Sequence, residues 1–357
     1  GRVEEAKSHA RVALDAFPAV ARTILARIAM ASGDLEEAER EARAAVASRS
    51  GTTTPVLTLA EVLAARGDAA GALGVIAGVE DELRTRSLPD PRPFLLRSEL
   101  LRAGGDDGGA VEALDEASRL TDRLLAINPS SPAAHAARAR IFELRGDEER
   151  SIEALERALE AGALDDVSKP RLALEWSRRG RAGDAAALVE ALAGRGDLDA
   201  MHALAVARSE EGDQAAARRV LRLALERDPD QPAMLETLGL VDLRAGDARA
   251  ALHSLERATE LGIESANAWN LLGVARWQDA RDAAGAIAAW ERALTLDPTR
   301  WETLYNLARV ASETGRADLA RRALERFVAN APAERYGAEL VEARAALAKL
   351  SGGAGAP

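Results

Sequence analysis

Apolar residues recur at helical spacing along nearly the whole chain, in segments of about a dozen residues separated by short polar turns. Most of the turns contain a glycine, often followed by aspartate, and successive turns lie 32 to 41 residues apart. The turn residues are Gly33, Gly67, Gly105, Gly146, Gly180, Gly212, Gly246, Arg281 and Gly315. A constant period that contains two amphipathic segments predicts an all-α protein built from tandem helical hairpins.

The residue types within each period agree with that arrangement. The first segment of a period carries a small residue after a leucine, for example Ala60 after Leu59 and Gly273 after Leu272, and the second carries alanines. Small residues allow the two helices of a hairpin to approach closely. The turn glycine can end the first helix in a left-handed conformation, and the following aspartate can cap the second. Second segments often end at a residue before proline, such as Asp297, which disfavours the helical conformation.

One segment, residues 266–300, resembles the tetratricopeptide repeat (TPR) motif closely. The motif positions are occupied by Trp269, Leu272, Gly273, Ala286, Trp290, Ala293 and Pro298. Neighbouring segments match nearly as well, and the resemblance extends over essentially the whole sequence. It implies a right-handed α-solenoid of helix-turn-helix hairpins, in which first helices line a concave groove and second helices form the convex back.

The resemblance and the spacing predict an organisation into four parts. Residues 1–18 are expected to form the second helix of a truncated repeat, residues 19–332 nine repeats, residues 333–350 a capping helix, and residues 351–357 a flexible tail. The expected repeats are 19–52, 53–90, 91–131, 132–165, 166–197, 198–231, 232–265, 266–300 and 301–332. Two stretches are longer than the period requires: residues 84–93, expected to be an extended connection, and residues 116–132, expected to lengthen a second helix. For both stretches two interpretations stay open: drift in a degenerate repeat, or a contact with a partner.

The composition excludes several classes of function. The 357 residues carry a net charge of −11, which disfavours nucleic acid or an anionic membrane surface as the main partner. There is no cysteine, and the four histidines fall in different repeats without a metal-binding spacing. Phosphate-binding and dinucleotide-binding loops are missing, as is an apolar stretch long enough to cross a bilayer. We therefore expect no enzymatic activity, cofactor, metal or membrane insertion. The sequence does not decide whether the protein is located in the cytoplasm or in the bacterial cell envelope.

Amide and aromatic side chains concentrate on two of the expected first helices, around residues 267–309. We predict a ligand-binding surface there because amides can pair with a peptide backbone and aromatic residues and arginine are frequent in binding hot spots. The candidate residues are Asn267, Asn270, Trp277, Gln278, Glu302, Tyr305, Asn306 and Arg309. We interpret Trp269 and Trp290 as packing residues and leave Trp277 and Tyr305 open between packing and binding. Lysines used by TPR domains that bind carboxyl termini are missing, so that activity is not expected.

The sequence thus favours a non-catalytic scaffold that binds a protein or peptide in the concave groove. Two alternatives stay open. Residues 321–350 resemble the end of TPR tails attached to bacterial sulfatase-like hydrolases, which would make this a docking or regulatory tail of a larger enzyme. Alternatively, an uncapped N-terminal face, covered by an upstream domain or by another copy, would allow end-to-end self-assembly.

Overall fold

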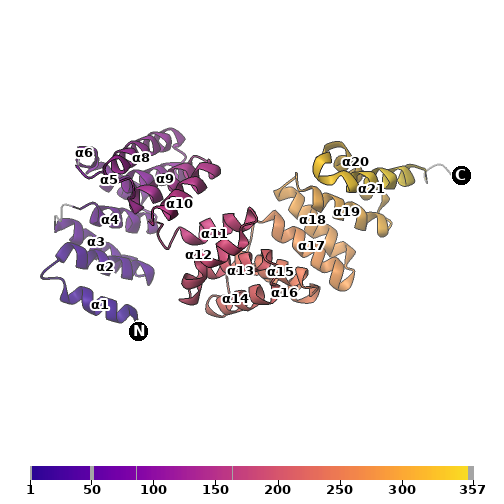
Figure 1. The fold of residues 1–357 in the computed structure, drawn as a ribbon, viewed down its shortest axis with the longest axis horizontal. Helices are drawn as coiled ribbons and strands as arrows, with labels where there is room; N and C mark the ends of the chain where they lie inside the picture. Colours follow the sequence, from indigo (N-terminus) through magenta and orange to yellow (C-terminus); the bar gives the residue numbers. More distant parts are fainter. Residues whose placement is uncertain (1, 49–51, 86, 163, 353–357) are drawn as a thin grey trace. The chain divides into compact units, whose positions relative to one another are not determined.

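Every secondary-structure element in the described part of the chain is a helix (Figure 1). The computed structural model describes residues 2–48, 52–85, 87–162 and 164–352. Contacts between Cα atoms group these residues into two compact units, residues 1–168 and residues 169–357, here named unit 1 and unit 2. The predicted all-α architecture of tandem hairpins is confirmed.

Unit 1 contains ten helices among its described residues. They are α1 (Arg2–Val12), α2 (Pro18–Ala31), α3 (Leu35–Ala47), α4 (Thr54–Ala65), α5 (Ala69–Ala77), α6 (Glu80–Thr85), α7 (Arg92–Ala103), α8 (Asp107–Ile127), α9 (Pro132–Leu144) and α10 (Glu148–Glu160). The first helices of its hairpins are α2, α4, α7 and α9, and each packs on the helix that follows it.

Unit 2 contains eleven helices among its described residues. They are α11 (Lys169–Arg178), α12 (Ala182–Gly194), α13 (Leu198–Glu210), α14 (Gln214–Arg227), α15 (Pro232–Arg244), α16 (Ala248–Glu260), α17 (Ala266–Ala280), α18 (Ala283–Leu296), α19 (Trp301–Glu313), α20 (Ala317–Asn330) and α21 (Ala333–Gly352). The first helices here are α11, α13, α15, α17 and α19.

The turns within hairpins have the predicted geometry. All eight turn glycines have a positive φ, between 74° and 87°, and Arg281 adopts the same left-handed region with a φ of 52°. The aspartates that follow cap the second helices: the Asp34 carboxylate accepts a hydrogen bond from the Glu37 amide at 3.0 Å, and Asp213 accepts one from Ala216 at 2.8 Å. The sequence Gly-Asp therefore ends one helix and begins the next.

The small residues of the first helices are buried against the second helices, as predicted. Ala26, Ala60 and Ala308 have no exposed surface. The closest approach is at Gly273, where a Cβ atom would lie 2.4 Å from the Trp290 indole nitrogen. At Gly239 a Cβ atom would lie 2.5 Å from a Leu255 side-chain carbon, so only glycine fits the present spacing at both positions.

Neighbouring hairpins pack mainly through the second helix of one and the first helix of the next, as α3 does on α4 and α16 on α17, and most successive first helices also contact each other. In unit 1, α2 contacts α4, α4 contacts α7, and α7 contacts α9; in unit 2, α11, α13, α15 and α17 form the corresponding series. In the described residues, no two second helices of neighbouring hairpins pack as closely. Within each unit the first helices therefore form one continuous surface, which we call the first-helix face.

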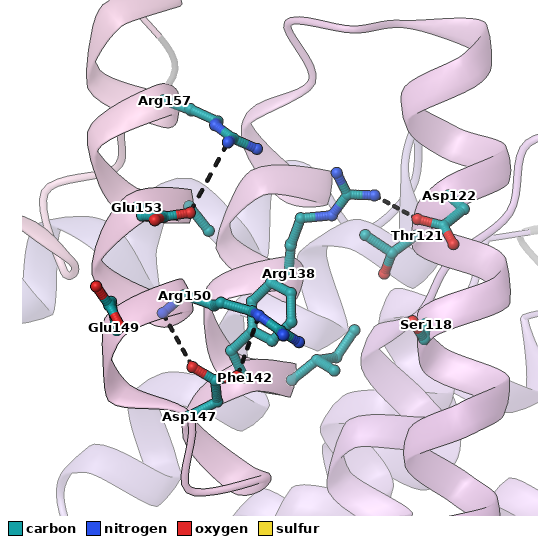
Figure 2. Close-up of a pocket in the computed structure, with 12 residues that line it drawn as sticks. Ser118, Thr121, Asp122, Arg138, Phe142, Asp147, Glu149, Arg150, Glu153 and Arg157 are labelled. Atoms are coloured by element: carbon teal, nitrogen blue, oxygen red, sulfur yellow. Dashed lines mark hydrogen bonds and ion pairs between the residues drawn. The ribbon is translucent and has the colours of Figure 1, made fainter.

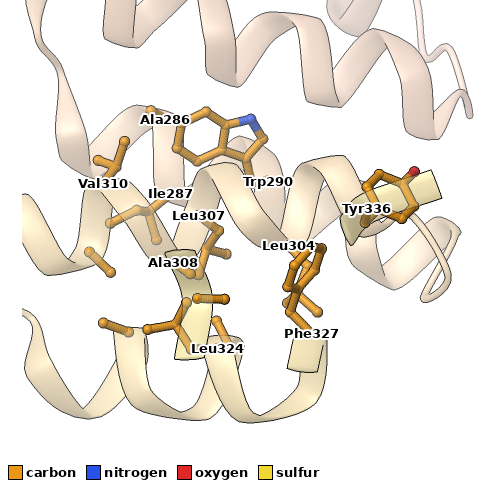
Figure 3. Packing of buried hydrophobic residues seen from close by; sticks show 14 of the residues in the cluster. Ala286, Ile287, Trp290, Leu304, Leu307, Ala308, Val310, Leu324, Phe327 and Tyr336 are labelled. Carbon is orange, nitrogen blue, oxygen red and sulfur yellow. The ribbon is translucent and has the colours of Figure 1, made fainter. Parts of the chain in front are cut away.

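The C-terminal core of unit 2 shows how the last hairpin is closed (Figure 3). Trp290 and Phe327 are fully buried in a cluster that includes Leu304 and Tyr336. Helix α21 contributes Tyr336 and Leu340 to this cluster and exposes its opposite side. The capping helix is thereby confirmed; it is helical through Gly352, and the remaining residues of the predicted tail, 353–357, lie outside the described residues.

Three local features differ from the sequence-based expectations. Helix α1 ends at Val12, six residues before the predicted end at residue 18. The second helix of the hairpin that begins with α4 is divided into α5 and α6 near Gly78, so helix occupies the beginning of the connection at residues 84–93 that was predicted to be extended. The boundary between the units falls between residues 168 and 169, within the predicted repeat 166–197. By contrast, α8 has the predicted extra turns, with 21 residues against 13 in α10.

Candidate protein-binding surface

One position of each first helix recurs on the first-helix face: the residue that directly follows the small packing residue. In unit 2 this residue is aliphatic and partly exposed in four successive helices, and the fifth carries an exposed arginine. These residues are Leu174 (α11), Val206 (α13), Leu240 (α15), Val274 (α17) and Arg309 (α19). Since the position is equivalent in each hairpin, the four aliphatic residues form an apolar row across unit 2, one side chain for each helix.

Hydrogen bonds between neighbouring first helices flank this row on the side of the helix N-termini. The Asn267 amide donates to Glu236 at 2.7 Å and accepts from Arg300, which joins α15, α17 and the start of α19. The Thr303 hydroxyl donates to the Asn270 side chain at 2.9 Å. Asn267 and Asn270 are therefore occupied by contacts between repeats.

The C-terminal helix covers a further part of the predicted surface. The Glu302 carboxylate accepts hydrogen bonds from Tyr336 and Arg335, both at 2.6 Å. Tyr305 donates to Glu342, and its ring lies 5.3 Å from that of Phe327. Burial and the Glu342 carboxylate raise the pKa of Tyr305 to about 12. Glu302 and Tyr305 thus bond α19 to α21. Tyr305, which the sequence left open between packing and binding, makes an intramolecular contact in the structure.

The other four predicted residues keep their polar groups available. Gln278 and Arg309 are exposed, Asn306 is partly exposed, and none of the three has an intramolecular hydrogen bond or ion pair in the described part of the chain. The indole ring of Trp277 is partly exposed, with the guanidinium of Arg281 at 4.8 Å from its centre. We call Trp277, Gln278, Asn306 and Arg309 the α17–α19 patch.

A cavity of about 450 Å³ lies between the starts of α19 and α21, and none of the four patch residues lines it. Asn270 and Glu302 line it, together with residues that the sequence analysis did not single out. These are Asp297, Thr299, Arg300, Trp301, Pro332, Arg335 and Tyr336. Sequence spacing gave no indication of this cavity, because it forms where two inter-repeat turns, more than 30 residues apart, come together.

Unit 1 has a cavity of about 560 Å³ between α8, α9 and α10, shown in Figure 2. Its charged walls are paired: Arg138 bonds to Asp122, Arg150 lies 3.3 Å from Asp147, and Arg157 lies 3.8 Å from Glu153. The figure shows these groups around an open centre, with Phe142 beneath Arg150. Three of the four carboxylates that line this cavity are thus paired with an arginine, and the fourth is Glu149.

The two stretches that exceed the repeat period meet in unit 1. A second cavity of about 560 Å³ is lined by Leu88 and Pro89 from the connection before α7, by Leu124 and Asn128 from the extra length of α8, and by the start of α4. The Asp90 carboxylate accepts a hydrogen bond from the Thr53 hydroxyl, which joins the connection to the start of α4. It also accepts one from Arg92 at the start of α7. Burial alone would raise the pKa of Asp90, but these hydrogen bonds hold it below its ordinary value.

The described residues contain no group of three or more acidic or histidine side chains that could hold a metal ion. None of the described helices is both long and apolar enough to cross a bilayer. The His202 ring bonds to the Thr237 hydroxyl at 2.8 Å, and burial lowers the pKa of His202.

Sequence comparisons agree with the geometry of the hairpins. Three models described as tetratricopeptide repeat match residues 95–166 and 237–300, residues 198–231, and residues 278–350, and together they cover more than half of the sequence. The chain belongs to the tetratricopeptide repeat family. TPR proteins are generally non-catalytic scaffolds that mediate interactions between proteins.

The fold is shared with a solved structure of low sequence identity. The crystal structure of the APC/C hetero-tetramer Cut9–Hcn1 has 13% identity and a TM-score of 0.54, over 98% of this chain and 93% of that chain. Yeast Tom70 has 14% identity and a TM-score of 0.45 over the same shares of the two chains. A MamA AMB-1 structure has 23% identity and a TM-score of 0.38, over 46% of this chain and 91% of that chain. No curated protein sequence matches the chain significantly.

Proposed function

We propose that this TPR protein is a non-catalytic scaffold that binds a protein or peptide on the first-helix face of unit 2, at the α17–α19 patch. The observation that carries the proposal is the unused bonding capacity of Gln278 on α17 and of Asn306 and Arg309 on α19, together with the partly exposed Trp277 on α17. Tryptophan and arginine are the residues most often found in binding hot spots, and amides pair readily with a peptide backbone. That Cut9, a protein with this fold, forms a hetero-tetramer with Hcn1 supports the proposal.

The test is selection from a random peptide library against the full chain, followed by affinity measurement with variants. Trp277→Ala and Arg309→Ala should each weaken the selected peptides about tenfold, since hot-spot side chains contribute more than about 1 kcal/mol. Arg219→Ala, which removes an exposed arginine from the second helix α14, is the matched control and should leave affinity unchanged. Peptides that bind equally to both patch variants would show that the patch is not the site.

A second candidate function, self-association, is favoured by the corner between α1 and α2. Four of the large apolar residues that the described chain exposes lie there: Val12, Phe17, Val20 and Ile24, which are 80%, 66%, 58% and 42% exposed. Exposed apolar clusters commonly mark interaction surfaces. Light scattering after size exclusion tests this: a mass that rises with concentration, and falls in Val20→Ser, is expected, whereas a monomer at all concentrations rules it out.

A further inference from the structure

A third cavity, in unit 2, is lined mainly by leucines and lies outside the proposed binding surface. Its volume is about 300 Å³, and it is bounded by α18, α19 and α20. Leu304 and Leu307 of α19 are buried, whereas Leu294 of α18 and Leu319 of α20 are partly exposed. Because two of the four leucines keep exposed surface, an apolar group that enters the cavity gains from covering it.

Two arginines of α20 also line the cavity, and no carboxylate bonds to them. Arg322 has no hydrogen bond or ion pair within the described residues. Arg326 donates a hydrogen bond to the carbonyl oxygen of Pro298, which leaves its charge uncompensated. Glu291 is the one carboxylate in the lining, and it bonds to neither arginine. The lining therefore combines apolar surface with a net positive charge.

The spacing of the two arginines favours an acidic ligand. Arg322 and Arg326 are four residues apart in α20, so their side chains share one side of the helix. Like charges at this spacing destabilise a helix, because the two groups repel each other. A carboxylate bound at the cavity would remove that repulsion, and guanidinium groups bind carboxylates through strong, charge-assisted hydrogen bonds.

The corresponding cavity of unit 1 has a different charge pattern. It lies between α8, α9 and α10 (Figure 2), again between two second helices and the first helix that separates them in sequence. Counted from the turn glycine, Glu153 of α10 corresponds to Arg322 of α20, and Arg157 corresponds to Arg326. Glu153 lies 3.8 Å from Arg157. The hairpin thus accommodates a carboxylate at this position, and unit 2 has an arginine there instead.

We infer that the cavity between α18, α19 and α20 binds a segment of a partner protein in which a bulky apolar residue is flanked by acidic residues. The apolar side chain covers Leu294 and Leu319, and the carboxylates accept hydrogen bonds from Arg322 and Arg326. A nucleic acid would leave the leucines uncovered, and the net charge of −11 opposes its approach. This site uses second helices and is separate from the α17–α19 patch.

The probe is a short labelled synthetic peptide with one phenylalanine flanked by glutamates in a background of serine and glycine. One control peptide has glutamine in place of each glutamate, and a second has serine in place of phenylalanine. Fluorescence anisotropy with the full chain should show the probe binding at least about tenfold more tightly than either control. The advantage over the glutamine peptide should shrink as salt is added, because salt screens exposed charges. Equal affinity of the probe and either control would overturn the inference.

Variants locate the bound probe. Arg322→Gln and Arg326→Gln should each weaken it about tenfold, since each removes a charge-assisted hydrogen bond. The matched control is Arg219→Gln, because Arg219 is an exposed arginine of the second helix α14 and has no hydrogen bond or ion pair in the described part of the chain. If both cavity variants bind the probe as the control variant does, the cavity is not the site.

Arg322→Glu gives unit 2 the charge pattern of unit 1 and separates binding from folding. The new carboxylate can pair with Arg326 as Glu153 does with Arg157, so thermal unfolding should show a chain at least as stable as the wild type. The probe should no longer bind this variant, and retained binding would contradict the inference. If Trp277→Ala weakens the probe while the arginine variants do not, the probe occupies the α17–α19 patch; the proposed function then stands and this inference falls.

Discussion

Units 1 and 2 are built from the same hairpin but differ at one position of the first helix. The residue after the small packing residue is Arg27, Glu61, Glu99 or Arg140 in unit 1, and it is aliphatic in four of the five first helices of unit 2. Unit 1 has 30 acidic and 21 basic residues, a net charge of −9, whereas unit 2 has 28 and 26, a net charge of −2. Helix packing requires a small residue at one position of the first helix, whereas the residue after it lies at the surface and can differ between the units.

The charged face of unit 1 is largely satisfied within the unit. Arg140 bonds to Glu99 at 2.7 Å and to Glu143 at 2.9 Å, and Arg27 donates to the Thr58 hydroxyl at 3.3 Å. In unit 2 the aliphatic side chains have no polar partner to satisfy and stay partly exposed. At this one position, the side chain contributes polar contacts between repeats in unit 1, whereas in unit 2 it leaves apolar surface partly exposed.

The largest expected effect tests whether the two units unfold independently of each other. Trp290→Ala removes the largest fully buried side chain of unit 2 and should destabilise that unit by about 3–5 kcal/mol. Because repeats interact mainly with their neighbours, amide hydrogen exchange should accelerate in α17–α20 and stay unchanged in α2–α9. Leu114→Ala, in the core of unit 1, is the mirror variant. Accelerated exchange throughout both units would show that they unfold together.

A smaller effect is expected at the carboxylate that holds the capping helix. Burial alone would raise the pKa of Glu302, but the hydrogen bond from Tyr336 and the charges of Arg335 and Arg300 hold it below its ordinary value. The stabilisation that the ionised Glu302 carboxylate provides is therefore complete above about pH 4, near the pKa of a glutamate in the unfolded chain. It is lost as the pH falls through the lower pKa that Glu302 has in the folded state. Tyr336→Phe should cost about 1 kcal/mol at neutral pH, measured by hydrogen exchange in α19–α21. An equal cost at pH 3 would contradict this assignment.

The smallest effect has the opposite sign and lies in unit 1. Burial raises the pKa of Glu61 above its ordinary value, even though the charges of Arg27 and Arg92 lower it, and no hydrogen bond to its carboxylate is found in the described structure. Because the Glu61 carboxyl ionises less readily in the folded state, the folded state loses stability as the pH rises from about 4 through the raised pKa of Glu61. Glu61→Gln should stabilise unit 1 by about 0.5 kcal/mol at neutral pH, with no gain at pH 3. Glu36→Gln, on an exposed site of α3, is the control.

Much of the fold could be predicted because it depends on local sequence. Turn glycines, capping aspartates and small packing residues act within a few positions of where they stand, so their spacing was sufficient. The division of a second helix near Gly78 and the boundary at residue 168 were not predicted, since both depend on how hairpins pack rather than on the period. At the candidate site, residue types singled out α17 and α19, but they could not predict the contacts of Tyr305 with Glu342 and of Glu302 with Tyr336, which join residues more than 30 positions apart.

The close contact of Gly273 with Trp290 has a consequence for specificity. The glycine determines how near the two helices of the hairpin lie, and the next residue, Val274, belongs to the row. A methyl group at Gly273 or Gly239 would collide with the second helix of the same hairpin, so the first helix and the row residue it carries would have to shift. Interior residues would then reposition surface residues without being exposed themselves, so new specificity could arise in this scaffold through changes that leave its surface composition untouched.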